Sequence, residues 1–410
     1  MRTSFDAVII GAGPAGSAAA ILLAGAGWSV ALVEKQTFPR RKVCGECIAA
    51  SNLPLLDALG IGAAFDARAG PALRQLALMR GEDCIVADLP PAPDARHRWG
   101  RALGRETLDT LLLERARSVG AQVLQPWAVL AIEADAGERR CTVQAVDSQA
   151  IMCLRTPVVI DAHGSWEALP SGRGPRRAAR KASDLFAFKA NFRGASLREG
   201  LLPVLSFDGG YGGMVVANNG LTTLACCLRR DRLEAARHAA PGQRAGDVVQ
   251  AAIERGGAGV RDALRSASRE GPWMAAGPID PGIRLDADDG LLHIGNAAGE
   301  AHPIIGEGIS MALQSAFLLC TLLLVAAPNP TRSTEVWQRD LGRRYAAAWR
   351  REFQPRLMLA AAFAHAAMRP LPGACLVALA RGWPGLLTSG ARWGGKVRSA
   401  ADPAFFRPAH

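Results

Sequence analysis

The chain has 410 residues, of which 49% are hydrophobic and 21% are charged, and its formal net charge is +11. This length accommodates two or three domains with large apolar cores, and the composition excludes a disordered or collagen-like chain. A buried-strand pattern already begins at Ala7, so we expect no cleavable signal peptide and a cytoplasmic location. The nine cysteines include no paired C-x-x-C motifs with nearby histidines, and we therefore expect no metal site.

The positive charge is concentrated near the C-terminus, where residues 320–410 carry 13 Lys or Arg against 4 Asp or Glu. These cations are dispersed among apolar helical stretches and not gathered in a stripe with aromatic residues, so nucleic acid is not an expected partner. They form either solvated helix faces or a contact with an anionic membrane surface or a partner protein. No apolar stretch reaches the ~20 residues that span a bilayer, which predicts core or interfacial helices.

The clearest motif lies in residues 6–34, DAVIIGAGPAGSAAAILLAGAGWSVALVE. A short apolar run over 7–10 predicts a buried parallel strand, an Ala/Leu-rich run to residue 26 predicts a helix, and a second apolar run over 30–33 predicts another strand. The strand–turn–helix context is the one in which G-x-G-x-x-G binds a dinucleotide.

Each glycine of this motif has a mechanical role. Gly11 permits the tight turn, Gly13 lets a pyrophosphate approach the backbone, and Gly16 allows the helix and strand to pack closely. The helix N-terminus offers free N–H groups and a positive dipole to the phosphates. Glu34, at the end of the second strand, lies where an acidic side chain holds ribose hydroxyls.

The remaining elements follow in chain order. The segment 37–48 predicts a loop, 52–68 a helix and turn, 72–88 two strands, and 104–116 an amphipathic helix with Arg105 in its first turn. Residues 121–164 predict short strands with a three-stranded antiparallel excursion, ending in a buried strand followed by Asp161, His163 and Gly164. Strands over 184–230, a helical stretch over 242–267, a buried strand over 291–294 and a long apolar helix from 306 complete the pattern.

Three separated blocks resemble the FAD-dependent oxidoreductases of the aromatic-hydroxylase and geranylgeranyl-reductase superfamily: GAGPAG with Glu34, the GRETLD helix, and LLHIGNAAGEAHPIIGEGISMALQSA. The resemblance implies an α/β fold with a Rossmann-like FAD-binding domain that carries a β-meander, an antiparallel-sheet substrate domain and C-terminal helices. The FAD-binding domain would comprise residues 1–70, 100–170 and 280–325. The substrate domain would comprise 71–99 and 171–279, and the helical region 326–410.

The resemblance also implies the residues of an FAD site. The Gly-rich turn would bind the pyrophosphate, Glu34 the adenosine ribose, Arg105 the ribityl and phosphate region, and the loop from Pro303 to Gly308 the flavin pyrimidine, where a positive helix end stabilises reduced flavin. The expected cofactor-binding residues are Gly11, Gly13, Pro14, Ala15, Gly16, Glu34, Lys35, Arg41, Cys44, Gly45, Arg105, Leu124, Asp161, Gly164, Gly295, Asn296, Pro303, Gly306, Gly308 and Ile309.

Three departures from the family patterns bear on the reaction. His163-Gly164 stands where the family has Asp-Gly, which leaves the mode of NAD(P)H engagement open. Halogenation is not expected, since no lysine lies between Lys42 and Lys181 and the segment around Trp273 matches the W-x-W-x-I-P motif poorly. Only half of the reductase motif Y-G-W-x-F-P survives, because Tyr211 is followed by GGMVV, and this weakens the prenyl-reductase alternative without excluding it.

The leading hypothesis is an FAD-dependent monooxygenase that uses NAD(P)H and O2, through a flavin C4a-hydroperoxide, to hydroxylate a small apolar, phenolic or lipid-like metabolite. The alternative is an FAD-dependent reductase or dehydrogenase of an isoprenoid or lipid-like substrate, and a third hypothesis is a non-enzymatic flavoprotein at a membrane surface. His302 is the candidate proton relay or else a structural loop histidine. Tyr211, Met214 and Trp273 are candidates for the substrate pocket or else plain core.

Overall fold

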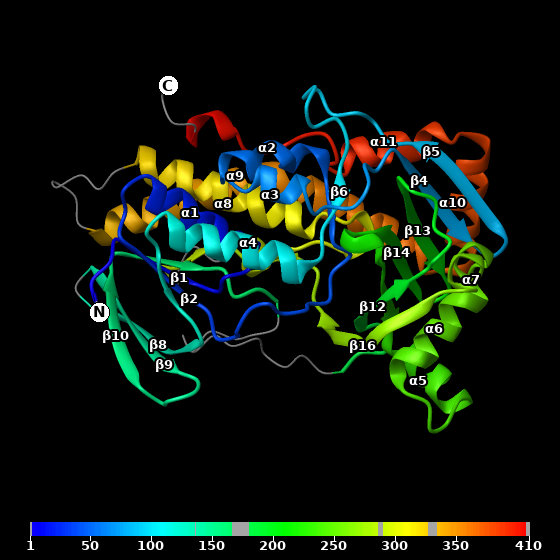
Figure 1. Cartoon of the computed structure of the whole chain (residues 1–410), viewed down its shortest axis with the longest axis horizontal. Helices are drawn as coiled ribbons and strands as arrows, with labels where there is room; N and C mark the ends of the chain where they lie inside the picture. The colour runs from blue at the N-terminus through cyan, green and yellow to red at the C-terminus, as the bar shows by residue number, and fades with distance from the viewer. Residues whose placement is uncertain (1, 136, 166–179, 286–289, 327–333, 407–410) are drawn as a thin grey trace.

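The structure is a computed structural model that describes residues 2–135, 137–165, 180–285, 290–326 and 334–406 (Figure 1). Two sheets lie side by side along the long axis, and helices from the C-terminal third run across both of them. The N-terminal sheet is covered by α1, α4 and α8, and the second sheet carries α5, α6 and α7 at the other end of the molecule.

The N-terminal sheet has five parallel strands in the order β18 (Leu292–His293), β11 (Val158–Asp161), β1 (Ala7–Ile10), β2 (Val30–Val33) and β7 (Gln122–Leu124). Successive side chains of a strand point to opposite faces. Ala7 and Ile9 accordingly join the core beneath the helices, whereas Val8 and Ile10 join the core on the opposite face. Burial on both faces explains why β1 and β2 are uninterrupted apolar runs in the sequence.

Helices cover one face of this sheet and a β-meander covers the other. The helical layer contains α1 (Pro14–Gly25), α4 (Arg105–Ser118) and α8 (Gly308–Val325), with the short α2 (Leu53–Ala58) and α3 (Gly62–Asp66) beside them. The meander consists of β8 (Trp127–Asp135), β9 (Glu138–Ala145) and β10 (Ile151–Thr156). By length and composition α8 could cross a membrane, but 67% of it is buried in the protein.

The second sheet has seven strands in the order β16 (Ser268–Ile279), β12 (Leu185–Arg193), β15 (Thr222–Arg229), β14 (Gly210–Val216), β13 (Leu201–Phe207), β4 (Gln75–Arg80) and β5 (Asp83–Asp88). All neighbours are antiparallel except β13 and β4. One face packs on α5 (Arg230–Ala239), α6 (Ala245–Gly256) and α7 (Ala258–Leu264). The other face, which includes Tyr211 and Cys227, is turned toward the C-terminal helices.

The two sheets are joined by small pairs of strands and by the C-terminal helices. One pair is β3 (Cys47–Ile48) with β6 (Arg101–Ala102), and the other is β17 (Gly282–Ile283) with β19 (Gly299–Glu300). The long α9 (Thr334–Ala367) packs along α8, and its C-terminal end reaches the second sheet. Beyond it, α10 (Pro370–Gly382) and α11 (Gly385–Trp393) pack on β4 and β5.

The expected fold class is confirmed, with a parallel sheet, a meander, an antiparallel-rich second sheet and C-terminal helices. Two elements were not expected. The helix α5 has no fully buried residue, and only partly buried side chains such as Leu233 contact the core of the second sheet. The strand β16 contains Pro272 and Pro278, which argue against a strand, but it lies at the sheet edge where proline is tolerated.

Candidate functional site

A cavity of about 470 Å³ extends from the Gly-rich turn after β1, between the two sheets, to the helices α9, α10 and α11. At its first end it meets the carboxyl ends of the parallel strands, where ligands of open α/β sheets bind. Many of the expected cofactor residues line it: Gly13, Pro14, Ala15, Cys44, Gly45, Arg105, Gly164, Gly295, Asn296, Pro303, Gly306, Gly308 and Ile309.

The Gly-rich turn is packed closely at two glycines and open at the third. Gly11 has φ of +98°, and a Cβ on Gly16 would lie 1.9 Å from the carbonyl oxygen of Gly11. A Cβ on Gly13, by contrast, would meet only the Arg105 guanidinium, at 3.9 Å, and Gly13 faces the cavity. No side chain caps the N-terminus of α1, which begins here. The turn therefore offers an uncapped helix end and an accessible backbone to an anionic group.

Glu34 is held against the back of this turn. Its carboxylate accepts hydrogen bonds from the backbone N–H of Ala12 at 2.9 Å and of Gln36 at 2.9 Å, and it pairs with Arg40 at 3.3 Å. The side chain is buried and does not itself line the cavity. The Arg40 Nε atom is also buried and has no hydrogen-bond partner among the described residues. An acid and an unused donor thus lie together where a ribose would sit.

Two cations converge on the open side of the turn. Arg105, the first residue of α4, is buried and donates from Nε and Nη2 to the Asp109 carboxylate at 2.7 and 2.8 Å. Lys42 lines the cavity, and its Nζ would lie 3.5 Å from a Cβ on Gly164. Burial, and next the positive charges of Arg105 and Arg40, lower the pKa of Lys42 to about 8. Such crowding of positive charge suits a phosphate-bearing ligand.

The loop before β3 is anchored between the two sheets by Glu46. This residue is not a glycine, yet it has φ of +59°. Its buried carboxylate accepts hydrogen bonds from the Thr223 hydroxyl at 2.6 Å and the Arg105 backbone N–H at 2.9 Å, and it pairs with the buried ammonium of Lys189. These contacts offset the strain of the backbone. They hold Cys44, Gly45 and Glu46 itself at the cavity wall.

The opposite wall is built from the turns η3 (Gly295–Ala297) and η4 (Pro303–Ile305) and the start of α8. Gly295 and Gly306 both have positive φ, near +60°, which permits the sharp bends. The Asn296 amide donates to the Ser165 hydroxyl at 2.8 Å. As at α1, no side chain caps the N-terminus of α8. The positive end of a second helix dipole therefore faces the same cavity.

Lys396, which follows α11, enters this wall from the C-terminal region. Its Nζ atom lies 3.2 Å from the carbonyl oxygen of Gly306 and 3.2 Å from the fully buried Glu307 carboxylate. Although burial acts to lower the pKa of Lys396, Cys47 and Glu307 raise it overall, so the side chain remains an ammonium. Lys396 was not predicted, because a single lysine among apolar helices shows no local pattern.

The half of the cavity beyond these walls is apolar. The lining residues that come from the second sheet and from α9, α10 and α11 are uncharged, and apart from the phenol of Tyr211 they are apolar side chains, thiols and small residues. The buried carboxylate of Glu300 also lines the cavity. Burial raises the pKa of Tyr211, and the charge of Glu300 acts in the same direction. Among the expected pocket residues, Tyr211 and Met214 lie here. Large apolar side chains that also line this part of the cavity are those of Leu76, Leu78, Leu202, Val204, Phe363 and Leu376.

His302 lies behind Tyr211 and is not a lining residue. Burial, and then the neighbouring His365 ring at 5.3 Å, lower the pKa of His302 to about 4. The Nδ1 atom of His302 and the hydroxyl of Tyr211 share a hydrogen bond of 3.0 Å. This environment disfavours the protonated form of His302 near neutral pH. The role of His302 as a proton relay stays a prediction.

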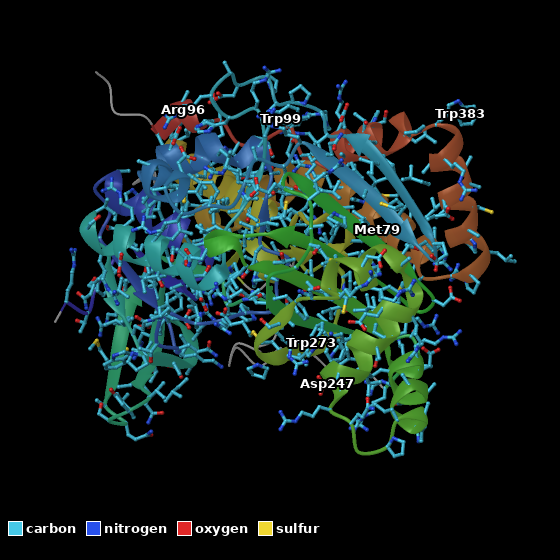
Figure 2. All side chains as sticks on the ribbon, turned by 45° about the vertical axis from the view of Figure 1, so that its right-hand side comes forward. Met79, Arg96, Trp99, Asp247, Trp273 and Trp383 are labelled. Atoms are coloured by element: carbon cyan, nitrogen blue, oxygen red, sulfur yellow. The ribbon has the colours of Figure 1, made fainter. Side chains whose placement is uncertain are left out.

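Trp273 is also outside the cavity, so its expected place in the substrate pocket is wrong. Its ring packs against Phe192, and its Nε1–H donates to Gln250 on α6 at 3.3 Å (Figure 2). A Cβ on Gly246 of α6 would lie 2.2 Å from the Trp273 Cβ atom. Trp273 of β16 therefore packs against α6.

Several expected cofactor residues support the site from outside its lining. Asp161 accepts a hydrogen bond from the His163 backbone N–H at 3.1 Å, and its carboxylate also binds the imidazoles of His163 and His293. Leu124 is buried in the core on the meander side. Arg41 is 40% exposed and pairs with Glu106 at 3.0 Å, and Lys35 is exposed. The Gly-rich turn packs closely at Gly11 and Gly16, and the Glu34 carboxylate binds its backbone at Ala12.

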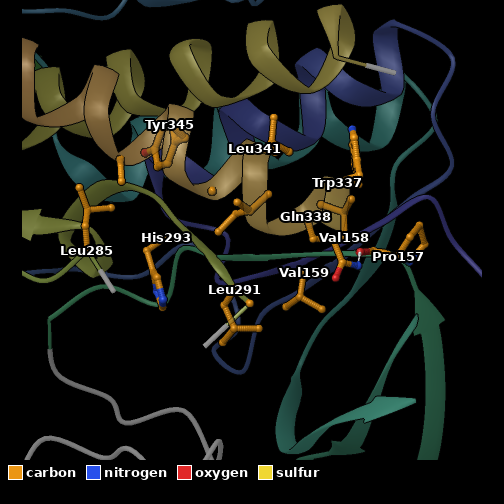
Figure 3. Close-up of a pocket in the computed structure, with 14 residues that line it drawn as sticks. Pro157, Val158, Val159, Leu285, Leu291, His293, Trp337, Gln338, Leu341 and Tyr345 are labelled. Atoms are coloured by element: carbon orange, nitrogen blue, oxygen red, sulfur yellow. Dashed lines mark hydrogen bonds between the residues drawn. The ribbon is translucent and has the colours of Figure 1, made fainter. Parts of the chain in front are cut away.

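A much smaller cavity, of about 20 Å³, lies between β11, β18 and α9 (Figure 3). Val158, Leu291 and Leu341 contribute to its wall, together with the imidazole of His293. It has room for about one water molecule and is a packing void rather than a ligand site.

The comparisons with known proteins agree with this geometry. Menaquinone reductase from Mycobacterium tuberculosis is 31% identical over 158 residues, which cover 38% of this chain and 38% of that protein. Digeranylgeranylglycerophospholipid reductase from Methanocaldococcus jannaschii is 22% identical over 86% of this chain and 84% of its own. A triple mutant of the flavin-dependent brominase Bmp2 shares the fold with a TM-score of 0.75 and 17% identity, covering 98% of this chain and 97% of that one.

The FAD binding domain family model matches residues 4–240, which is more than half of the chain and includes the Gly-rich turn, α4 and much of the second sheet. The resemblance to FAD-dependent oxidoreductases is thereby confirmed. The chain belongs to the FAD binding domain family of flavoproteins.

Proposed function

We propose that the protein is an FAD-dependent reductase or dehydrogenase of an elongated, isoprenoid or lipid-like substrate. The observation that carries this proposal is the single cavity that begins at a polar cofactor cradle and continues as an apolar tunnel. The sequence favoured a monooxygenase and kept the reductase as the alternative. We rank the reductase first because an apolar tunnel suits a long hydrocarbon better than a small phenol.

The residues of the cradle fit FAD. Bound FAD would supply hydride-transfer chemistry, with NAD(P)H as the proposed electron donor. Arg105 and Lys42 would neutralise the diphosphate beside the end of α1, and Glu34 would hold the adenosine ribose. The start of α8 and the Lys396 ammonium would stabilise negative charge at the pyrimidine edge of the flavin.

The apolar half would orient the substrate by shape. The second sheet and the helices α9, α10 and α11 contribute no charged side chain to the lining, so burying a charged substrate group among them would be costly. Apolar contacts with Leu78, Val204 and Phe363 would instead hold an alkyl or prenyl chain. The names of the two reductase relatives support reduction of a lipid-like molecule.

A monooxygenase acting on a similar apolar substrate is the second candidate. The same enclosed apolar wall would exclude water from the reacting carbon, as oxygenases require. The two candidates differ in the product, because reduction adds two hydrogens to the substrate and needs no oxygen, whereas hydroxylation adds one oxygen atom.

The deciding experiment incubates the FAD-loaded protein with NAD(P)H or dithionite and a panel of prenyl lipids and prenyl quinones, with and without oxygen, and identifies products by mass. We expect a hydrogenated product under strict anaerobiosis. A product that appears only with oxygen and carries an added oxygen atom would establish the monooxygenase instead.

A pair of variants tests the cavity itself. Val204→Phe narrows the tunnel at a lining residue, whereas Val146→Phe alters an exposed residue outside it. We expect Val204→Phe to lower kcat/KM for long substrates about 10-fold or more, on the scale of a steric misfit in a packed site, while FAD content is unchanged. Val146→Phe serves as the matched control and should behave as the wild type.

A further inference from the structure

Exposed apolar side chains gather on the three C-terminal helices. Of the fourteen large hydrophobic residues that are exposed in the described part of the chain, seven lie between residues 358 and 393. Leu371 is 80% exposed, Trp393 78% and Trp383 68%. The set, which we call the cap patch, consists of Met358, Leu359, Leu371, Leu379, Trp383, Leu386 and Trp393.

The helix periods place these residues on outward faces. Leu371, Cys375 and Leu379 recur every four residues along α10, and Leu386 and Trp393 are seven residues apart on α11. All five are exposed. Trp383, in the turn between the two helices, projects at the periphery of the molecule (Figure 2). Exposed apolar side chains gathered on neighbouring helices are typical of an interaction site.

The charge around the cap patch has one sign. From residue 353 to residue 401 the chain contains five arginines and one lysine but no Asp or Glu. Arg369 and Arg392 are exposed at the ends of α10 and α11. Two neighbouring acids are engaged in ion pairs: Asp83 of β5 pairs with Arg381, and Glu352 of α9 pairs with Arg351 and Arg398.

The cap patch also surrounds the far end of the cavity. Leu359, Leu379 and Leu386 are exposed and at the same time line the cavity, one from each of the three helices. The tunnel therefore opens to the outside between α9, α10 and α11, within the apolar surface. A substrate that leaves an apolar phase here would enter the tunnel without crossing water.

From these observations we propose that the cap patch docks on the surface of an anionic lipid bilayer, so that the tunnel opens into the membrane. Exposed tryptophans and leucines insert at the boundary between headgroups and acyl chains, and surrounding arginines attract anionic headgroups. The proposed function enters this proposal only where we name the molecule that passes from the membrane into the tunnel. The surface itself is independent of the reaction.

The test is co-sedimentation of the FAD-loaded full chain with vesicles of phosphatidylcholine alone or with 30% phosphatidylglycerol, at low and high salt. We expect binding to the anionic vesicles that falls at least 10-fold in the triple variant Leu371→Ser, Trp383→Ser, Trp393→Ser. The double variant Arg369→Gln, Arg392→Gln should lose most of its salt dependence. FAD content and circular dichroism show that each variant is folded.

The matched control is Ile151→Ser, which removes a 67% exposed apolar side chain from β10, far from the cap patch. It should bind vesicles as the wild type does. Wild-type protein that stays in solution with anionic vesicles would overturn the proposal, as would equal loss of binding in the control. A dimer that the triple variant abolishes, without vesicle binding, would assign the surface to a second copy. None of these measurements involves turnover, so they stand apart from the test of the reaction.

Discussion

Lys42 and Arg105 illustrate how single side chains prepare the site for an anion. Both are positive, both lie at the cavity, and Arg105 has Asp109 as a partner in the buried first turns of α4. Burial, and next the charges of Arg105 and Arg40, lower the pKa of Lys42 to about 8, although the carboxylates of Asp109 and Glu34 act in the opposite direction. A bound diphosphate would supply further negative charge and favour the protonated lysine.

FAD binding should therefore depend on the Lys42 proton. We expect FAD affinity to fall as the pH rises above about 8, because the apo protein then loses the ammonium that the phosphate requires. Lys42→Met should weaken binding by about 10- to 100-fold at pH 7, the scale of a charge-assisted contact, and flatten the pH dependence. Titration by flavin fluorescence measures both effects. Lys181→Met, at an exposed position, is the control and should change neither.

His302 makes stability depend on pH in the acid range. Its pKa of about 4 in the folded chain is below the ordinary 6.5, so between these values the unfolded chain binds more protons. The free energy of unfolding should consequently fall as the pH drops from 6.5 toward 4, by about 2 kcal/mol after allowance for partial solvent screening. Urea unfolding of His302→Asn should show a shallower fall. An identical pH dependence in the two proteins would contradict the assignment.

At the scale of elements, the strand–turn–helix unit β1–α1 combines two glycines needed for packing with one needed for the ligand. Gly16 lies where α1 touches the turn, and Gly13 lies where the backbone faces the cavity. The same residue type in one motif therefore serves the fold at one position and the cofactor at another.

Substitution of the two glycines should separate these roles. Gly16→Ala forces a Cβ to within 1.9 Å of a carbonyl oxygen, so we expect severe destabilisation or failure to fold. Gly13→Ala meets nothing closer than 3.9 Å and should leave the apo protein folded while weakening FAD binding. Thermal unfolding with and without FAD distinguishes the outcomes. Equal losses of apo stability in both variants would show that Gly13 is structural.

At the scale of the whole molecule, the C-terminal region completes the cofactor end as well as covering the tunnel. Lys396, nearly 400 residues from the Gly-rich turn, pairs with Glu307 at the start of α8. Glu307 is fully buried, so its carboxylate depends on this contact and on the nearby Arg356, whose guanidinium it faces across Gly395. The tail thereby stabilises the wall that faces the proposed flavin pyrimidine.

Removing one partner of this pair should cost more than removing both. Lys396→Met leaves the Glu307 carboxylate buried with less compensation, and we expect a loss of about 3 kcal/mol in the free energy of unfolding. The double variant Lys396→Met, Glu307→Gln should recover much of that loss. Denaturant unfolding of the two single variants and the double variant measures the coupling. Additive losses would mean that the two side chains do not interact.

Much of the fold could be predicted from the sequence because its signals are local. The run at 7–10, the glycine spacing and the apolar helices each follow from neighbouring residues, and they identified the parallel sheet, the meander and the Gly-rich turn of the cavity. Signals failed where the local pattern is weak, as in α5, which has no fully buried residue, and in the proline-containing edge strand β16.

The sequence by itself determined the nucleotide-binding unit, since each step from β1 to Glu34 depends on residues that are close along the chain. Only the tertiary structure decided the rest. It showed that His302 is buried beside His365, which lowers its pKa to about 4, that Trp273 packs outside the cavity, and that Lys396 reaches the carbonyl oxygen of Gly306 before α8. These properties depend on burial and on contacts between distant segments, which a local pattern does not contain.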